Sequence, residues 1–87
     1  MTVSSEVLAV LADVLGTRDV YATPGLLLYE LELLDSLRTV ELILALSDRF
    51  GIEISPAEID RERWASPEKI VADVERRVAA ISAGSGR

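Results

Sequence analysis

Apolar residues recur at helical spacing in three stretches of the chain, residues 5–15, 36–50 and 67–81. Each stretch follows a good N-cap residue, and the first two end at a glycine suited to the left-handed stop position. In the third stretch, Arg76 and Arg77 lie in the later turns, where cations suit the helix dipole, and we expect Arg77 to tolerate alanine. The expected N-caps are Ser4 or Ser5, Asp35 or Ser36, and Ser66, the stops are Gly16 and Gly51, and the apolar stripe of the third stretch is Ile70, Val71, Val74, Val78 and Ile81.

Two further segments connect these helices. Ser55-Pro56-Ala57-Glu58 offers an N-cap serine, a proline at the first helical position and a glutamate three residues after the cap, which predicts a short helix. Residues 17–34 contain Pro24 and Gly25 and then a dense run of leucines. A strand there would have only the weak extended segment 52–54 to pair with, so we expect a long ordered loop pinned by its leucines. The expected fold is all-α: a small four-helix bundle with this long loop between the first and second helices and a short third helix.

The composition fits one small folded domain and excludes most kinds of catalytic site. With 87 residues, 49% apolar and 28% charged, there is room for a single domain, which we place at residues 1–82, followed by a flexible tail over residues 83–87. The chain has no cysteine and no histidine, which removes disulfides, the usual zinc ligands, thiol nucleophiles and the commonest general base. We therefore expect neither a self-contained enzyme nor a metal site.

The net charge of −6 is concentrated in the middle of the chain. Residues 30–62 carry nine acidic side chains against three arginines, and the remainder is neutral. Such a segment repels nucleic acid and anionic membrane and attracts basic partners, although it could equally be a solvated surface that only aids solubility. No apolar stretch approaches the roughly 20 residues that span a bilayer, and the N-terminus lacks a signal-peptide pattern, so we expect a cytoplasmic protein without membrane insertion.

The helix predicted over residues 36–50 carries more apolar surface than one core face needs. Its apolar positions cover roughly 220° of the helical wheel, and the excess lies at Leu37 and Leu44, on the edge that borders Glu41 and Asp48. An apolar strip rimmed by carboxylates suits a weak docking surface, because apolar contact supplies affinity and the acids steer basic partners. The expected partner-binding residues are Leu37, Arg38, Val40, Glu41 and Leu44.

Asp35 and Ser36 stand at the start of this helix, where spacing alone is compatible with a purely capping role. The segment 35–42, Asp-Ser-Leu-Arg-Thr-Val-Glu-Leu, followed by Ala45-Leu46, Phe50 and Glu53-Ile54, resembles the Asp-Ser-Leu signature of acyl and peptidyl carrier proteins. In that family a phosphopantetheinyl transferase links the prosthetic group from coenzyme A to the serine. The resemblance implies that Ser36 bears covalent 4′-phosphopantetheine, that Asp35 is an adjacent residue important to the modifying enzyme, and that the chain is a carrier and not an enzyme. A helix N-terminus also favours the resulting phosphodiester.

A second resemblance narrows the family. Leu33-Leu34-Asp35-Ser36-Leu37, Phe50-Gly51-Ile52 and residues 58–62 and 64–70 together resemble the D-alanyl carrier proteins and related discrete aminoacyl carriers. This implies a monomer loaded by an adenylating ligase and unloaded by an acyltransferase or synthase. Two positions depart from the pattern: Glu32 and Leu33 stand where many carriers have a glycine, and Arg38 stands where carriers of fatty acid synthesis tend to have an acid. The second departure bears on the identity of the partner enzymes.

Two settings are open for a carrier of an acyl or aminoacyl thioester. The alanine-rich, lysine-poor composition, with one lysine against eight arginines, suggests a GC-rich bacterial coding sequence, and on that basis we expect an aminoacyl carrier in polyketide or peptide natural-product (antibiotic) biosynthesis. The alternative is a D-alanyl carrier for D-alanylation of a cell-wall polymer such as teichoic acid. A further alternative is a non-catalytic helical adaptor without a prosthetic group.

Trp64 is the one tryptophan of the chain, and we expect it to pack in the core, or else to form a wall near the cofactor arm.

Overall fold

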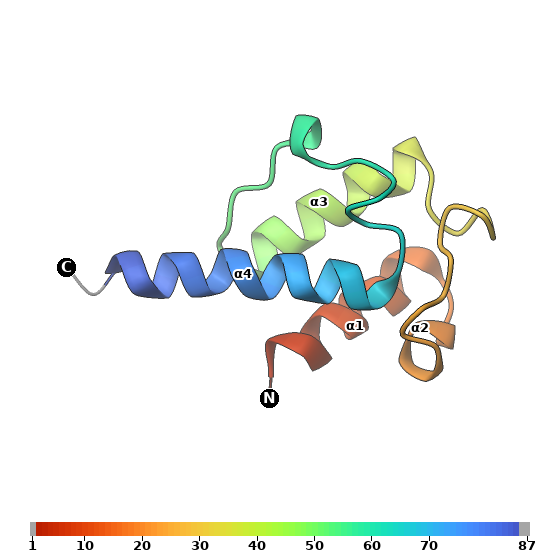
Figure 1. Ribbon diagram of the computed structural model, residues 1–87, viewed down its shortest axis with the longest axis horizontal. Helices are drawn as coiled ribbons and strands as arrows, with labels where there is room; N and C mark the ends of the chain where they lie inside the picture. Colours follow the sequence, from red (N-terminus) through yellow and green to blue (C-terminus); the bar gives the residue numbers. More distant parts are fainter. Residues whose placement is uncertain (1, 86–87) are drawn as a thin grey trace.

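The structure is a computed structural model that describes residues 2–85, with side chains described up to residue 81. Its elements are α1 (Val3–Leu15), α2 (Asp19–Ala22), α3 (Ser36–Phe50), the 3-10 helix η1 (Pro56–Glu58) and α4 (Pro67–Ser85). The first helix packs against both α3 and α4, and the segment carrying η1 arches back from the end of α3 to the start of α4 (Figure 1). The described residues contain no strand, which confirms the all-α expectation. The short third helix is a single 3-10 turn, and the long loop contains the additional short helix α2.

The helix ends follow from their capping residues. Thr2 caps α1 by accepting a hydrogen bond on its side-chain oxygen from the Ser5 N–H at 3.1 Å, so the prediction of Ser4 or Ser5 as N-cap was wrong. The helix therefore begins at Val3, before both serines. Both predicted stops are confirmed, because Gly16 and Gly51 adopt left-handed φ values of 70° and 63°.

One core lies between the three long helices, and Trp64 is its largest fully buried side chain, as expected for a core tryptophan. The α4 stripe contributes Ile70 and Val74, which are fully buried, but Ile81 is 48% exposed, so the predicted stripe was too long by one turn. The other fully buried apolar residues are Val7, Leu11, Val20, Leu28, Leu42, Leu46 and Pro67.

The loop before α3 is fixed through Leu28. Its N–H donates to the Ala65 carbonyl at 3.0 Å, and its carbonyl accepts from the N–H groups of Leu33 at 2.9 Å and Leu34 at 3.2 Å. Leu28 and Leu34 are buried, whereas Leu27 is 49% exposed. The prediction of an ordered loop pinned by leucines is confirmed for the two buried leucines, and this anchoring sets the position of the residues that follow Leu34.

The C-terminal end of the chain is helical for longer than expected. The tail predicted over residues 83–87 is covered by α4 up to Ser85, and residues 86–87 lie outside the described residues. Within residues 2–85, no helix is long and apolar enough to cross a membrane.

Candidate functional site

The start of α3 is built around the Asp35 carboxylate. Asp35 has an extended backbone, with φ −138° and ψ −173°, and its Oδ1 accepts a hydrogen bond from the Arg38 N–H at 2.8 Å. Asp35 is therefore the N-cap, and Ser36 is the first helical residue. The Ser36 side chain is exposed, and no hydrogen bond to its hydroxyl is found within the described part of the chain. The capping role falls to Asp35 alone, which leaves the Ser36 hydroxyl open to a modifying enzyme.

Arg38 lies beside this site and contacts the capping carboxylate. Its Nη1 is 3.7 Å from Asp35 Oδ2, and both side chains are substantially exposed, at 43% and 58%. An exposed pair at this distance contributes little to stability. Arg38 remains accessible to a partner protein, with its charge partly balanced by Asp35.

The turn that leads into the site places Glu32 in the left-handed region, with φ 59°. Glu32 is the one non-glycine residue in the described chain with a positive φ. A glycine adopts this conformation without the steric cost that a Cβ brings. The glutamate therefore carries a small backbone strain that a glycine at this position would not have.

A groove of about 770 Å³ opens beside Ser36, between α3 and the segment that carries η1. Its apolar wall includes Val40 and Ile43 from α3 and Ile59 from the opposite segment. A second groove of about 560 Å³, which shares Val40 and Ile43 with the first, continues along α3 toward Ile54. Together the two grooves form one long open groove that starts at Ser36 and runs along α3.

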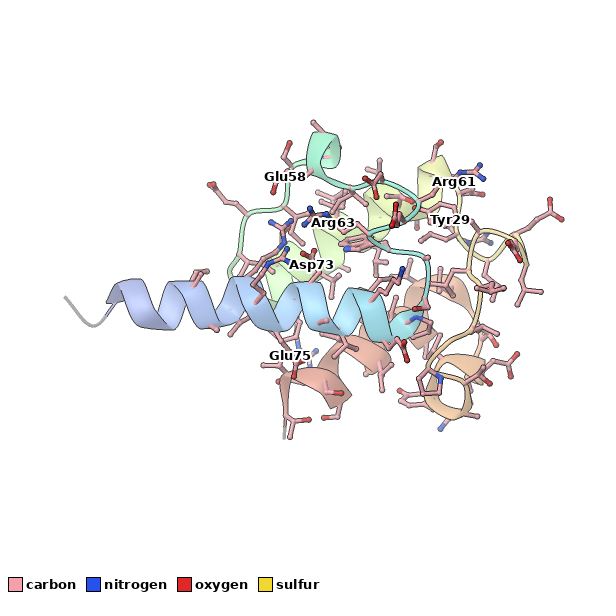
Figure 2. The ribbon with its side chains drawn as sticks, in the orientation of Figure 1. Tyr29, Glu58, Arg61, Arg63, Asp73 and Glu75 are labelled. Carbon is pink, nitrogen blue, oxygen red and sulfur yellow. The ribbon has the colours of Figure 1, made fainter. Side chains whose placement is uncertain are left out.

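The charged residues that line the first groove are three acids, Glu32, Asp35 and Asp60, and one base, Arg61. The Arg61 guanidinium lies over the Tyr29 ring, 5.2 Å from its centroid. Figure 2 shows this pair close to the N-terminal end of α3. Neither Arg61 nor Tyr29 was predicted as a site residue, because the fold brings them to the groove from two separate loops.

The outer edge of α3 carries the predicted docking residues. Leu37 is 69% exposed, Leu44 65% and Val40 46%, although all three are apolar. Glu41 is also exposed on this helix. Leu42, Ile43 and Leu46 turn to the core, so the helix divides into a buried face and an unpartnered apolar edge as the wide apolar arc indicates. The exposure of this edge is what docking requires.

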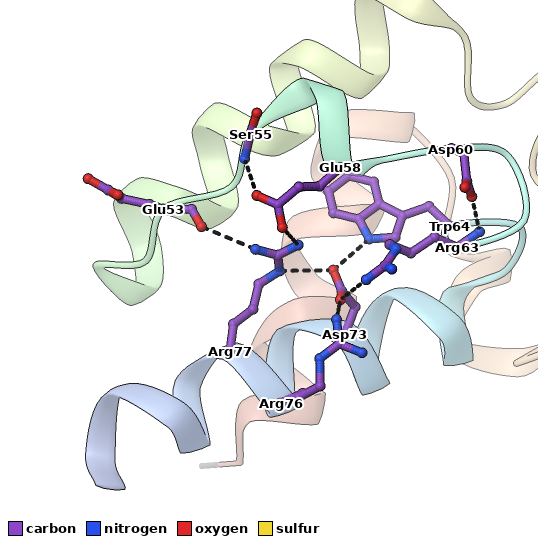
Figure 3. Close-up of polar contacts among 9 residues, drawn as sticks. All are labelled: Glu53, Ser55, Glu58, Asp60, Arg63, Trp64, Asp73, Arg76 and Arg77. Carbon is purple, nitrogen blue, oxygen red and sulfur yellow. Dashed lines mark hydrogen bonds and ion pairs between the residues drawn. The ribbon is translucent and has the colours of Figure 1, made fainter. Parts of the chain in front are cut away.

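The segment that forms the far wall of the groove is tied to α4 by a buried carboxylate, Asp73 (Figure 3). Asp73 is 3% exposed and accepts hydrogen bonds from Trp64 Nε1 at 3.0 Å and Arg77 Nε at 3.1 Å. Arg63 and Arg76 add ion pairs to its other oxygen. Burial alone raises the pKa of Asp73, but the hydrogen bonds from Trp64 and Arg77 and the charges of Arg77 and Arg76 outweigh it, so the pKa lies below its ordinary value.

Arg77 extends this network to the η1 segment. Its guanidinium donates to the Glu53 carbonyl and to Glu58 Oε1, both at 3.2 Å, and its side chain is only 13% exposed. Arg76 and Arg77 lie in the middle of α4 and form ion pairs with Asp73. The prediction that they lie in the later turns and favour the helix dipole was therefore wrong. The i, i+3 and i, i+4 spacing of Asp73, Arg76 and Arg77 was the signal in the sequence that could have revealed the pairing.

The comparison with protein families agrees with this geometry. The family model described as phosphopantetheine attachment site matches residues 5–74. This chain belongs to the phosphopantetheine carrier family. Carriers of this family hold 4′-phosphopantetheine covalently on a serine, and they are substrates of partner enzymes and not catalysts. Transferase and ligase enzymes are accordingly its general class of partner.

Curated relatives cover most of the chain. The carrier is 45% identical over 74 residues to the D-alanyl carrier protein of Lacticaseibacillus casei, which spans 85% of this chain and 91% of the relative. It is 44% identical over 71 residues to the D-alanyl carrier protein of Bacillus velezensis, covering 82% and 91%. For that of Enterococcus faecalis the identity is 37% over 75 residues, covering 86% and 96%. The predicted resemblance to D-alanyl carriers is confirmed.

Proposed function

We propose that Ser36 bears the phosphopantetheine group and that the protein is an aminoacyl carrier of the D-alanyl type. The observation that carries the attachment site is the division of roles at the start of α3: Asp35 caps the helix, and Ser36 presents an exposed hydroxyl on its first turn. The groove beside Ser36 gives a covalently attached arm room to lie along α3.

The residues at this site fit the group. The first N–H groups of a 15-residue helix and its dipole favour an anion at Ser36. The Asp35 cap holds the helix start in place, and the anchored loop behind it keeps the serine at a fixed position. When bound, the arm supplies the thiol that this chain lacks and on which a cargo is held as a thioester.

The relatives support D-alanine as the cargo. The names of all three relatives described above give D-alanyl as what they carry, over more than four fifths of this chain. The expectation of natural-product assembly rested on the lysine-poor composition of the chain. That composition reflects the base composition of the genome and carries no information on the cargo or on the partner enzymes. We therefore favour the alternative, D-alanylation of a cell-wall polymer, with loading in the cytoplasm by an ATP-dependent adenylating ligase onto a monomeric carrier.

Intact mass tests the attachment site. The wild-type protein, incubated with coenzyme A and a broad-specificity phosphopantetheinyl transferase, should gain the mass of one phosphopantetheinyl group, and Ser36→Ala should gain none. Ser55→Ala is the matched control, because Ser55 is another exposed serine at the start of a helical segment and its loss should not affect the gain. A modified Ser36→Ala variant would refute the site, and an unmodified wild type would leave the adaptor as the better description.

A ligase panel tests the cargo. The modified protein is offered to adenylating ligases for D-alanine, L-alanine, glycine and a set of acyl acids, and the mass of the loaded carrier is read. We expect rapid loading of D-alanine by a D-alanine ligase. Preferential loading by a natural-product ligase would reverse the choice between the two settings without affecting the attachment site.

The exposed edge of α3 is proposed as the docking surface for these enzymes. Leu37→Ala should weaken loading about tenfold, mainly through faster dissociation, because it removes roughly 1.5 kcal/mol of apolar burial in the complex. Glu41→Lys should slow association in a salt-dependent way. Arg38→Glu should change the preference among partners. Ile81→Ala is the control, since Ile81 is an exposed apolar residue on a different helix, α4. Wild-type rates for the three α3 variants at low and high salt would remove this edge from the interface.

A further inference from the structure

Arg61 differs from most arginines of the structure in having no carboxylate partner. Within residues 2–85, only Arg18 and Arg61 lack an ion pair, and both guanidinium groups lie over a tyrosine ring, Arg18 over Tyr21 at 5.4 Å and Arg61 over Tyr29 at 5.2 Å. The two pairs have the same chemistry but different surroundings. The paired arginines are Arg38, Arg49, Arg63, Arg76 and Arg77.

Only the Arg61 pair lines the groove that contains Ser36. It is also the one base in that lining, against the acids Glu32, Asp35 and Asp60. A guanidinium that lies over an aromatic ring and makes no ion pair has N–H groups available to an anion, and these groups match the oxygens of a phosphate. In this groove Arg61 is therefore the one side chain that attracts an anion, whereas the three carboxylates repel it.

We propose that Arg61 binds the phosphodiester of the prosthetic group, with Tyr29 as the residue that positions it. The inference rests on the proposed attachment at Ser36, which would place one permanent negative charge at the rim of this groove. The acids Glu32, Asp35 and Asp60 disfavour that charge, while Arg61 and the first turn of α3 favour it. The contact directs the arm into the groove between α3 and residues 56–61, instead of outward into solvent.

The alternative counter-ion is Arg38, which lies two residues after Ser36. Its guanidinium already contacts the Asp35 carboxylate at 3.7 Å, so its charge is partly neutralised, and it is not among the residues that line the groove. Arg61 lines the groove and makes no ion pair among the described residues. The charge that the phosphodiester brings is thus better matched by Arg61.

The test uses the apo and modified forms of wild type, Arg61→Gln, Arg61→Lys, Arg38→Gln and Arg18→Gln. The phosphorus-31 NMR shift of the modified protein, compared with the same protein unfolded in urea, reports the surroundings of the phosphodiester. The difference between the melting temperatures of the modified and apo forms reports the same contact independently of any partner enzyme. We expect a gain of about 2–5 °C on modification of wild type. Arg61→Gln should remove the gain and the folded-state phosphorus shift, Arg61→Lys should keep part of both, and Arg18→Gln should keep both in full.

Tyrosine variants separate positioning from charge. Tyr29→Phe keeps the ring under Arg61 and should behave as wild type. Tyr29→Leu should reduce the difference in phosphorus-31 shift between the folded and unfolded protein, and it should also reduce the change of that difference with salt concentration. Unchanged values in a modified Arg61→Gln protein, or a loss seen with Arg38→Gln in its place, would overturn the proposal. Intact mass is measured on every sample: a wild type that gains no group overturns the attachment at Ser36 and this inference with it, whereas modified protein with an unresponsive phosphorus signal overturns this inference alone.

Discussion

Replacing Asp73 by asparagine should destabilise the domain severely, because this carboxylate is buried and holds several donors at once. The charged hydrogen bonds from Trp64 and Arg77 involve side chains that are almost out of solvent, at 0% and 13% exposure. Such bonds contribute about 1.5–3 kcal/mol each. Arg63 and Arg76 are 42% and 62% exposed, so their pairs add less than about 1 kcal/mol each. The expected loss is about 3–5 kcal/mol, which is typical when one partner of a buried ion pair is removed.

A loss of this size is a large share of the total. A domain of 87 residues is stable by about 4–13 kcal/mol, so Asp73→Asn should lower the melting temperature by more than about 12 °C. Urea denaturation followed by circular dichroism measures the free energy of unfolding. The fluorescence of Trp64, the one tryptophan in the chain and a direct partner of Asp73, gives a local probe of the same transition.

The penalty should also depend on pH. The folded-state pKa of Asp73 is lower than that of the unfolded chain, so its contribution is fully present above the unfolded value of about 3.9 and is lost as the pH falls through the lower folded-state value. The stability difference between wild type and Asp73→Asn should therefore be constant near neutral pH and shrink below about pH 4. A difference that stays the same down to pH 3, or a penalty under 1 kcal/mol at pH 7, would refute the role of the charge.

The two neighbouring arginines give a matched comparison. Arg77→Ala should cost about 2–4 kcal/mol, because it removes the least exposed arginine partner of Asp73 and the contacts to Glu53 and Glu58. Arg76→Ala should cost less than about 1 kcal/mol, since Arg76 is mostly in solvent. This reverses the expectation from the sequence that Arg77 tolerates alanine. Equal denaturation midpoints for the two variants would contradict the assignment of the network to Arg77.

Three further pairs of variants test other parts of the structure. Ser36→Ala should change the free energy of unfolding by less than about 0.5 kcal/mol, and Asp35→Ala should cost about 1 kcal/mol, because Asp35 caps α3; urea denaturation showing the opposite order would move the cap to Ser36. Val74→Asp should unfold the domain by burying an unpaired charge, whereas Ile81→Asp, at a 48% exposed site, should melt near wild type, and similar melts for the two would mean that α4 is misplaced. Glu32→Gly should be more stable than Glu32→Ala by about 1 kcal/mol in calorimetry, since φ is 59° there; an advantage for alanine would place Glu32 outside the left-handed region.

Local patterns in the sequence predict the three long helices, the stops of the first two and the family, but not the short helix α2. Gly16, Gly51 and the cap at Asp35 act within one helical turn, so their effect can be read from neighbouring residues. The wide apolar arc of α3 likewise predicts an exposed edge at Leu37 and Leu44, because one helix face is enough to fill the core. The carrier motif at Asp35 and Ser36 is a local pattern too, and it led to the family that the comparisons confirm.

Contacts between side chains of different segments follow from the fold as a whole and could not be predicted from local patterns. Asp73 accepts a hydrogen bond from Trp64, which lies nine positions earlier in the sequence, and Arg77 donates one to Glu58, 19 positions earlier. Helical periodicity does not predict contacts between these segments. The loops that carry Tyr29 and Arg61 have no periodicity either, so their meeting beside Ser36 depends on the anchoring of Leu28 and on the path of the η1 segment. Local patterns fix local geometry, because backbone hydrogen bonds and side-chain periods act over a few residues. Contacts between segments are fixed by how the whole core packs, and the groove, its single cation and the buried carboxylate behind it arise at that level.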